Sequence, residues 1–219
     1  MSTATAPAVR RRDPVQERSQ ETVGRILAAA SALLAGGMAA QALTTAQIAG
    51  RAGLSVGALY RFFPDKQAVV DAIALRHLDA FQEALAAALM LDLPDSPAGF
   101  LAAVIDGFTA YLAANADFRT IAYGPPAAGG NGPSAGGGRA ISMALFEQQA
   151  GGGEMAAMLR DFLSTMFAIE VDADFDFRLR LAAEIGDRLI AHAFAQNDTQ
   201  HRERVLAEAK RLLAQYLFK

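Results

Sequence analysis

Apolar side chains recur at helical spacing along most of this 219-residue chain. From Val23 to Leu34 they return every three or four positions, which places them on one face of an α-helix. Gly36 and Gly37 follow this stripe, and glycine accepts the left-handed conformation found after helix C-termini. The pattern predicts an amphipathic helix that stops at Gly36 or Gly37.

Two short helices are predicted next. Thr44 or Thr45 offers a hydroxyl N-cap for the first, and Gly53 ends it. Ser55 can cap the second, which Pro64 closes. Two short helices joined by a tight turn have the length of a helix-turn-helix, whose second helix enters the major groove of DNA.

The remaining periodic segments predict helices as well. Asp65 is a suitable N-cap for a long helix that reaches about Met90. The fold is therefore predicted to be all-α, with about nine helices and a three-helix helix-turn-helix head joined to a larger helical domain. The later helices are expected at about 97–114, 116–122, 139–150, 154–169, 176–195 and 201–217.

The same pattern suggests a domain organisation. Residues 1–14 are polar and rich in arginine, and we expect them to form a flexible arm. Residues 15–65 would form the helix-turn-helix domain and 66–219 the larger helical domain. The stretch 123–138 is dominated by glycine, alanine and proline, so a flexible surface loop is expected there.

Composition limits the kinds of site that the chain can form and the cellular location that we expect. The chain has no cysteine, which excludes disulfides and cysteine-based zinc sites. The uncharged stretch 26–50 contains glycines and polar residues and changes its period midway, so we do not expect it to span a membrane. The N-terminus lacks the apolar segment of a signal peptide, and a cytoplasmic location is expected.

Charge is distributed unevenly. The net charge is −3, but residues 1–66 hold eight basic and four acidic residues, giving +4, and the remainder carries −7. A basic small module on an acidic larger one suits a head that binds phosphates.

The second short helix carries side chains suited to DNA. Gly57 and Ala58 are small enough to allow close approach, while Tyr60, Arg61 and Lys66 can reach phosphates or base edges. Tyr60 could instead be a core tyrosine, although its hydroxyl needs a polar partner.

The run TTAQIAGRAGLSVGALYRFFPDKQAVVDAI, residues 44–73, resembles the DNA-binding domain of TetR-family regulators. The resemblance implies that phosphates are contacted by Thr45, Tyr60 and Lys66, and that the groove is faced by Ser55, Val56, Gly57, Ala58 and Arg61. Val56 stands where the family commonly has lysine, and Phe62 where an aromatic residue or histidine is frequent. We therefore expect base reading to depend on Arg61 and on apolar contact with thymine methyl groups.

The resemblance also implies partners. Family members are homodimers that repress transcription by binding palindromic double-stranded DNA operators. A small effector releases them from the DNA, and here we expect a hydrophobic one. An antiparallel pair of C-terminal helices would form the dimer interface. Apolar residues suited to that interface are Leu179, Gly186, Leu189, Ala193, Leu206 and Leu213.

Aromatic and methionine side chains gather in the middle of the chain. Most would be ordinary bundle core, but some could line an apolar effector pocket between helices. The candidates are His77, Phe81, Phe108, Tyr111, Tyr123, Met143, Phe146, Phe162 and Met166.

Catalytic and metal-binding motifs are not found. The three histidines have no metal-ligand spacing, and the glycine-rich stretch lacks the Gly-Lys-Ser/Thr of a phosphate cradle. We therefore expect no enzymatic activity, no metal, no cofactor and no membrane partner. The alternative to a repressor is a helical small-molecule sensor or carrier that does not bind DNA.

Overall fold

The computed structural model describes residues 14–125, 152–195 and 198–218. Within these residues the chain forms nine α-helices and one 3₁₀ turn, with no β-strand, which confirms the predicted all-α fold. The elements are α1 (Pro14–Ala35), η1 (Ala40–Ala42), α2 (Thr45–Ala52), α3 (Val56–Tyr60), α4 (Lys66–Leu91), α5 (Pro97–Ala114), α6 (Ala116–Tyr123), α8 (Gly152–Phe167), α9 (Ala173–Phe194) and α10 (Thr199–Leu217).

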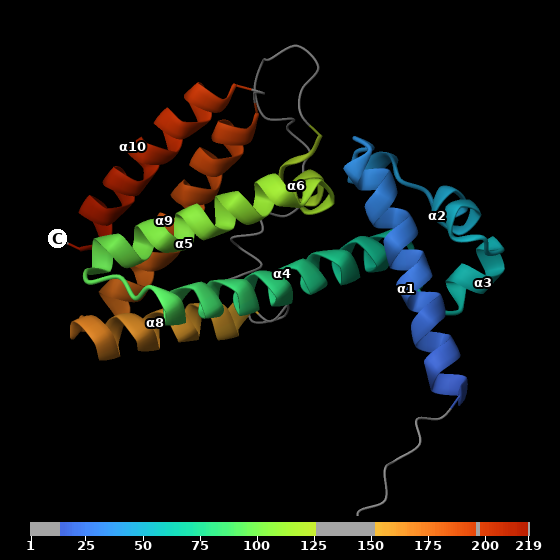
Figure 1. Ribbon diagram of the computed structural model, residues 1–219, viewed down its shortest axis with the longest axis horizontal. Helices are drawn as coiled ribbons and strands as arrows, with labels where there is room; N and C mark the ends of the chain where they lie inside the picture. The colour runs from blue at the N-terminus through green and yellow to red at the C-terminus, as the bar shows by residue number, and fades with distance from the viewer. Residues whose placement is uncertain (1–13, 126–151, 196–197, 219) are drawn as a thin grey trace, which may run out of the picture.

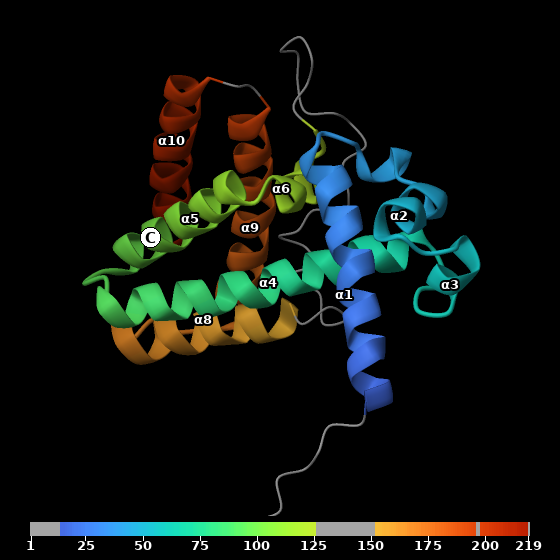
Figure 2. The same cartoon turned by 45° about the vertical axis from the view of Figure 1, so that its right-hand side comes forward.

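The helices are arranged as a small head and a larger body (Figure 1). The head contains α1, α2 and α3, and α1 crosses the first part of α4. From there α4 runs into the body, where α5 and α8 lie alongside it in both views (Figures 1 and 2). The last two helices, α9 and α10, pack against each other, and α10 also contacts α5. The helix α4 is therefore the continuous connection between head and body.

Helix boundaries in the head follow the capping residues. The side chain of Thr44 accepts a hydrogen bond from the Gln47 backbone N–H, and the Gln47 side chain accepts one from the Thr44 N–H, a reciprocal capping box. At the other end of α2, Gly53 adopts φ 66°, the left-handed conformation that glycine accepts without strain. Both ends of α2 lie where the sequence predicts them.

The next two helices begin at the predicted side-chain caps. The Ser55 hydroxyl accepts a hydrogen bond from the Ala58 N–H (3.1 Å), and the Asp65 carboxylate accepts one from the Ala68 N–H (2.8 Å). Pro64 lies in the turn between them. These caps confirm the predicted starts of α3 and α4.

Two hydrophobic clusters form the cores of head and body. In the head, Ile26, Ile48 and Leu59 are completely buried, and the early α4 residue Ile73 packs with them. From Leu78 onward the buried side chains of α4 belong to the body cluster. Because α4 contributes to both cores, the domain boundary expected between residues 65 and 66 stays a prediction.

Some expectations from the sequence differ from the structure or fall outside it. The helix α1 begins at Pro14, whereas the apolar stripe in the sequence starts only at Val23. The first turns of α1 carry mostly polar residues, so apolar periodicity does not reveal them. The helix expected at 139–150 and most of the arm 1–14 and the loop 123–138 lie outside the described residues.

Among the described helices, α5 is the one that is long and apolar enough to cross a membrane by length and composition, with a mean hydropathy of 1.4. Its side chains Phe100, Ile105 and Leu112 are buried in the body core. A core helix of this kind can have the same composition as a membrane span, so the composition of α5 alone is not evidence for a membrane span.

Candidate functional site

The outer surface of α3 is formed by the residues that sequence analysis assigned to DNA. Ser55, Gly57 and Arg61 are exposed, as are Val56 at 38% and Tyr60 at 51%. Ala58 is half-buried at the edge of the same surface. In contrast, Leu59 is completely buried and anchors α3 to the head core. The short helix therefore presents one small, polar and cationic face to solvent.

Two predicted phosphate contacts lie next to each other. The hydroxyl oxygens of Thr45, at the start of α2, and Tyr60, at the end of α3, are 3.4 Å apart. A half-exposed tyrosine whose hydroxyl faces another hydroxyl is not a core residue, which removes the alternative interpretation of Tyr60. Each hydroxyl can direct a proton to an external oxygen.

Lys66 already has a partner within the head. Its ammonium group donates a hydrogen bond to the backbone carbonyl of Gln41, in the 3₁₀ turn η1. An ammonium group has three protons, so this contact leaves donors for a phosphate. The predicted phosphate contact of Lys66 remains compatible with this position and stays a prediction.

The sequence did not indicate the role of Arg25. Its guanidinium, on α1, donates to the Ala52 carbonyl (2.5 Å) and the Gly53 carbonyl (3.4 Å) at the end of α2. Carbonyls at a helix C-terminus lack partners within the helix, so this side chain stabilises the turn before α3. A contact over 27 residues has no local sequence signal.

Comparison with known proteins identifies this head. The family model for bacterial regulatory proteins of the tetR family matches residues 26–73. A crystal structure of a TetR-family transcriptional regulator from Streptomyces coelicolor is 28% identical, with a TM-score of 0.61 over 91% of this chain and 97% of that one. The chain belongs to the TetR family. It is a TetR-family transcriptional regulator with a helix-turn-helix DNA-binding domain.

The overall architecture recurs in a second TetR protein. A TetR transcriptional regulator from Rhodococcus sp. RHA1 is 17% identical, with a TM-score of 0.57 over 93% of this chain and 98% of that one, and this likeness concerns the fold. No curated protein matches the chain in sequence.

In the body of this TetR-family chain, those predicted pocket residues that the structure describes lie in four places. Phe81 and Phe108 are buried in the body core, with ring centroids 5.2 Å apart. Phe162, with Met166, lines an apolar groove of about 380 Å³ between the end of α4, the start of α5, and α8. Met143 and Phe146 lie outside the described residues. These side chains therefore do not line one common cavity within the described part of the chain.

Tyr123 belongs to a separate buried contact. Its hydroxyl donates to Oδ1 of Asp187 on α9 (3.0 Å), and the Asp187 side chain is itself buried. Burial, followed by the charge and hydrogen bond of Asp187, raises the pKa of the Tyr123 hydroxyl well above 10. The phenol therefore stays protonated, and the contact joins α6 to α9.

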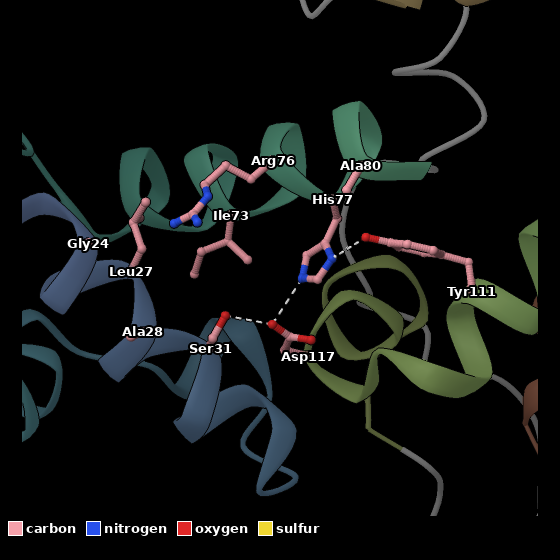
Figure 3. A pocket seen from close by; sticks show the side chains of 10 residues that line it. All are labelled: Gly24, Leu27, Ala28, Ser31, Ile73, Arg76, His77, Ala80, Tyr111 and Asp117. Atoms are coloured by element: carbon pink, nitrogen blue, oxygen red, sulfur yellow. Dashed lines mark hydrogen bonds and ion pairs between the residues drawn. The ribbon is translucent and has the colours of Figure 1, made fainter. Parts of the chain in front are cut away.

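His77 and Tyr111 line a second groove, where the head meets the body (Figure 3). His77 Nε2 lies 3.0 Å from Oδ2 of Asp117, and His77 Nδ1 lies 2.9 Å from the Tyr111 hydroxyl. Ser31 of α1 donates to the same Asp117 oxygen (2.5 Å). Nε2 therefore faces the carboxylate, and Nδ1 faces the Tyr111 hydroxyl. One hydrogen-bond chain therefore joins α1, α4, α5 and α6.

The Asp117 carboxylate is stabilised in its ionised form. Burial alone would raise its pKa, but hydrogen bonds from His77 and Ser31, the charge of His77 and the Phe118 backbone lower that pKa from 3.8 to about 2. Burial and the nearby Asp117 charge raise the pKa of the Tyr111 hydroxyl. At neutral pH the groove therefore contains an ionised carboxylate that is paired with His77 and Ser31.

Most residues predicted for the dimer interface face the interior of the same chain. Leu179, Gly186, Ala193 and Leu213 are buried, and Leu189 and Leu206 are half-buried. A Cβ at Gly186 would lie 3.3 Å from Leu213 Cδ1, so this glycine allows close packing of α9 on α10.

Other apolar side chains of α9 and α10 point outward. They are Phe177 (57% exposed), Ile185 (41%) and Leu212 (47%). Sequence periodicity identified the two helices but assigned their core face to the interface, because both faces of each helix carry apolar residues.

Proposed function

We propose that this TetR-family regulator is a homodimeric repressor that places α3 in the major grooves of a palindromic operator and releases the DNA when a small effector binds. The observation that carries the proposal is the exposed α3 surface of Gly57 and Arg61, beside the paired hydroxyls of Thr45 and Tyr60. Its basic head, with a net charge of +4 over residues 1–66, favours a polyanionic partner.

The roles on α3 follow from chemistry and position. Arg61 can form two hydrogen bonds to guanine in the major groove, and exposed Val56 can contact a thymine methyl group. Gly57 lets the helix backbone approach the bases. Thr45, Tyr60 and Lys66 would hold phosphates and so orient the head without reading sequence.

Dimerisation is supported by the outward apolar side chains of α9 and α10. Isolated exposed apolar residues are ordinary, but three large ones on two adjacent packed helices favour a partner helix pair. A second copy of the chain would present the same surface and bury both by two-fold symmetry. The two heads would then bind two half-sites on one face of the DNA.

Effector release would use the connection between head and body. The helix α4 contributes to both cores, so a change of its angle in the body moves the head. An effector that binds more tightly to the arrangement unsuited to the operator lowers DNA affinity by the difference in its two affinities.

A mobility-shift titration with DNA from upstream of the protein's own gene tests this proposal. The native protein should shift the DNA, and Arg61→Ala should weaken binding by about 1 to 3 kcal/mol because a base contact is lost. Arg180→Ala, an exposed arginine of α9, is the matched control and should bind like the native protein. If the native protein shifts no such DNA, the sensor or carrier without DNA binding becomes the better interpretation.

A further inference from the structure

The groove between head and body has the shape and chemistry of a small-molecule site. It has a volume of about 400 Å³ and is open to solvent on one side. Its walls come from α1 and α4, and its inner end is formed by Tyr111 of α5 and Asp117 of α6. We propose that this groove binds a small aromatic carboxylate, whose carboxylate pairs with Arg76 and whose ring lies between α1 and α4.

Arg76 supplies the cationic end of the groove. Its side chain is exposed, and no carboxylate of the described residues pairs with its guanidinium. Figure 3 shows the guanidinium on the Leu27 side of the groove, while His77 turns toward Tyr111 and Asp117. A guanidinium binds a carboxylate through two parallel hydrogen bonds, which a neutral amide cannot reproduce.

The middle of the groove suits a flat ring. The buried side chains Leu27 and Ile73 provide apolar surface, and the walls are lined by Gly24, Ala28 and Ala80. A Cβ at Gly24 would meet no atom within 4 Å, so the space beside α1 is open. Small residues on facing helices leave a narrow slot, and an aromatic ring fills such a slot with little loss of conformational entropy.

Protein side chains hold the polar inner end in place. Asp117 is the acidic group that faces the groove, and its charge is met by Ser31 and His77 at 2.5 and 3.0 Å. These two partners therefore reduce the repulsion between Asp117 and a ligand carboxylate. The remaining repulsion directs the ligand carboxylate to the Arg76 end of the groove. The imidazole is held in place by Tyr111 and by stacking on the Phe118 ring, with centroids 4.9 Å apart.

The position of the groove gives the ligand a regulatory role, an inference that rests on the proposed function. One wall belongs to the head and the other to the helix that connects head and body. A ligand that contacts both walls binds best at one angle between α1 and α4 and so shifts the population of head positions. An effector of this class carries a negative charge beside its hydrophobic ring.

Benzoate is a suitable probe, with benzamide as its neutral isostere. Titration of the full-length protein, followed by ¹H–¹⁵N correlation spectra, should shift amide signals of α1 and α4 around the groove and leave those of α10 unchanged. A ligand of this size should bind with a Kd on the order of 1 mM. Benzamide should bind at least tenfold more weakly because it lacks the charge that Arg76 pairs with.

Two variants test whether benzoate binds in this groove. Arg76→Gln should weaken benzoate binding about tenfold, and Gly24→Leu should abolish it by filling the slot. Arg180→Gln, which removes an exposed arginine outside the groove, should bind benzoate like the native protein. Arg76→Gln changes an exposed side chain and leaves both cores intact, so it keeps the test decisive even if Gly24→Leu unfolds α1.

The outcomes distinguish this inference from the proposed function. No benzoate binding, or equal binding by native protein and Arg76→Gln, overturns the assignment of the groove even if the protein binds its operator. Conversely, benzoate binding at the groove by a protein that shifts no operator DNA upholds the site and overturns the repressor. Operator affinity should fall in the native protein when benzoate is added at ~2 mM, close to the expected Kd, and should fall much less in Arg76→Gln, whose tenfold weaker binding leaves most of its sites empty.

Discussion

Gly57 leaves the surface of α3 open where the DNA would approach. The residue is exposed, and a Cβ built there meets no protein atom within 4 Å. A larger side chain therefore disturbs nothing inside the folded protein. It would occupy the space that α3 needs in the major groove.

Gly57→Leu should weaken operator binding at least tenfold without destabilising the fold. Its thermal midpoint should be unchanged or slightly higher, because glycine within a helix costs about 0.5 to 1 kcal/mol relative to alanine. Gly50→Leu, on α2 with the same open space, should keep operator affinity. Native-like DNA binding by Gly57→Leu would place the recognition surface elsewhere.

Asp117 links stability to pH. The pKa of its carboxyl is about 2 in the folded protein, compared with 3.8 as the ordinary value. A group whose pKa is lowered by folding contributes stability that is fully present above its unfolded pKa and is lost as pH falls toward its folded pKa. This contribution should be on the order of 1 to 2 kcal/mol, since the side chain is 14% exposed.

Denaturant unfolding at pH 7, 4 and 2.5 measures this effect in native protein and Asp117→Asn. The free energy of unfolding of the native protein should exceed that of the variant at pH 7, and the difference should shrink between pH 4 and 2.5. A difference that is the same at all three pH values would show that the ionised carboxylate does not stabilise the junction.

At the scale of elements, the head depends on side-chain caps. Its helices α2 and α3 have eight and five residues, too short to be stable alone in water. Their ends are set by Thr44, Gly53 and Ser55, and Arg25 completes the last turn of α2. The capping residues were recognisable in the sequence because each acts within three or four positions of itself.

Asp65 begins the helix that joins head to body, which makes its cap a useful target. Asp65→Ala should lower the free energy of unfolding by about 1 kcal/mol, because the carboxylate no longer accepts from the Ala68 N–H. Asp65→Asn keeps an acceptor and should lose much less. Equal stability of the alanine and asparagine variants in urea unfolding would contradict a capping role.

At the scale of the molecule, assembly should depend on the outward face of α9 and α10. The double variant Ile185→Lys and Leu212→Lys should convert the proposed dimer to a monomer, because charges replace apolar side chains in the buried interface. Sedimentation velocity measures the change. Met90→Lys, at an 87% exposed apolar position outside these helices, is the control and should remain dimeric. A double variant that still sediments as a dimer would exclude this face.

The sequence by itself determined the helical class, the head, both ends of α2 and the starts of α3 and α4. Apolar periodicity, caps such as Asp65 and the ordered string from Thr44 to Ile73 are local signals, and local backbone preferences act over a few residues. The tertiary structure alone decided which apolar faces turn inward on α9 and α10, since both faces carry apolar side chains. It also brought Ser31, His77 and Asp117 together from three helices. Such contacts depend on how helices pack across long sequence separations, which periodicity along one helix does not specify.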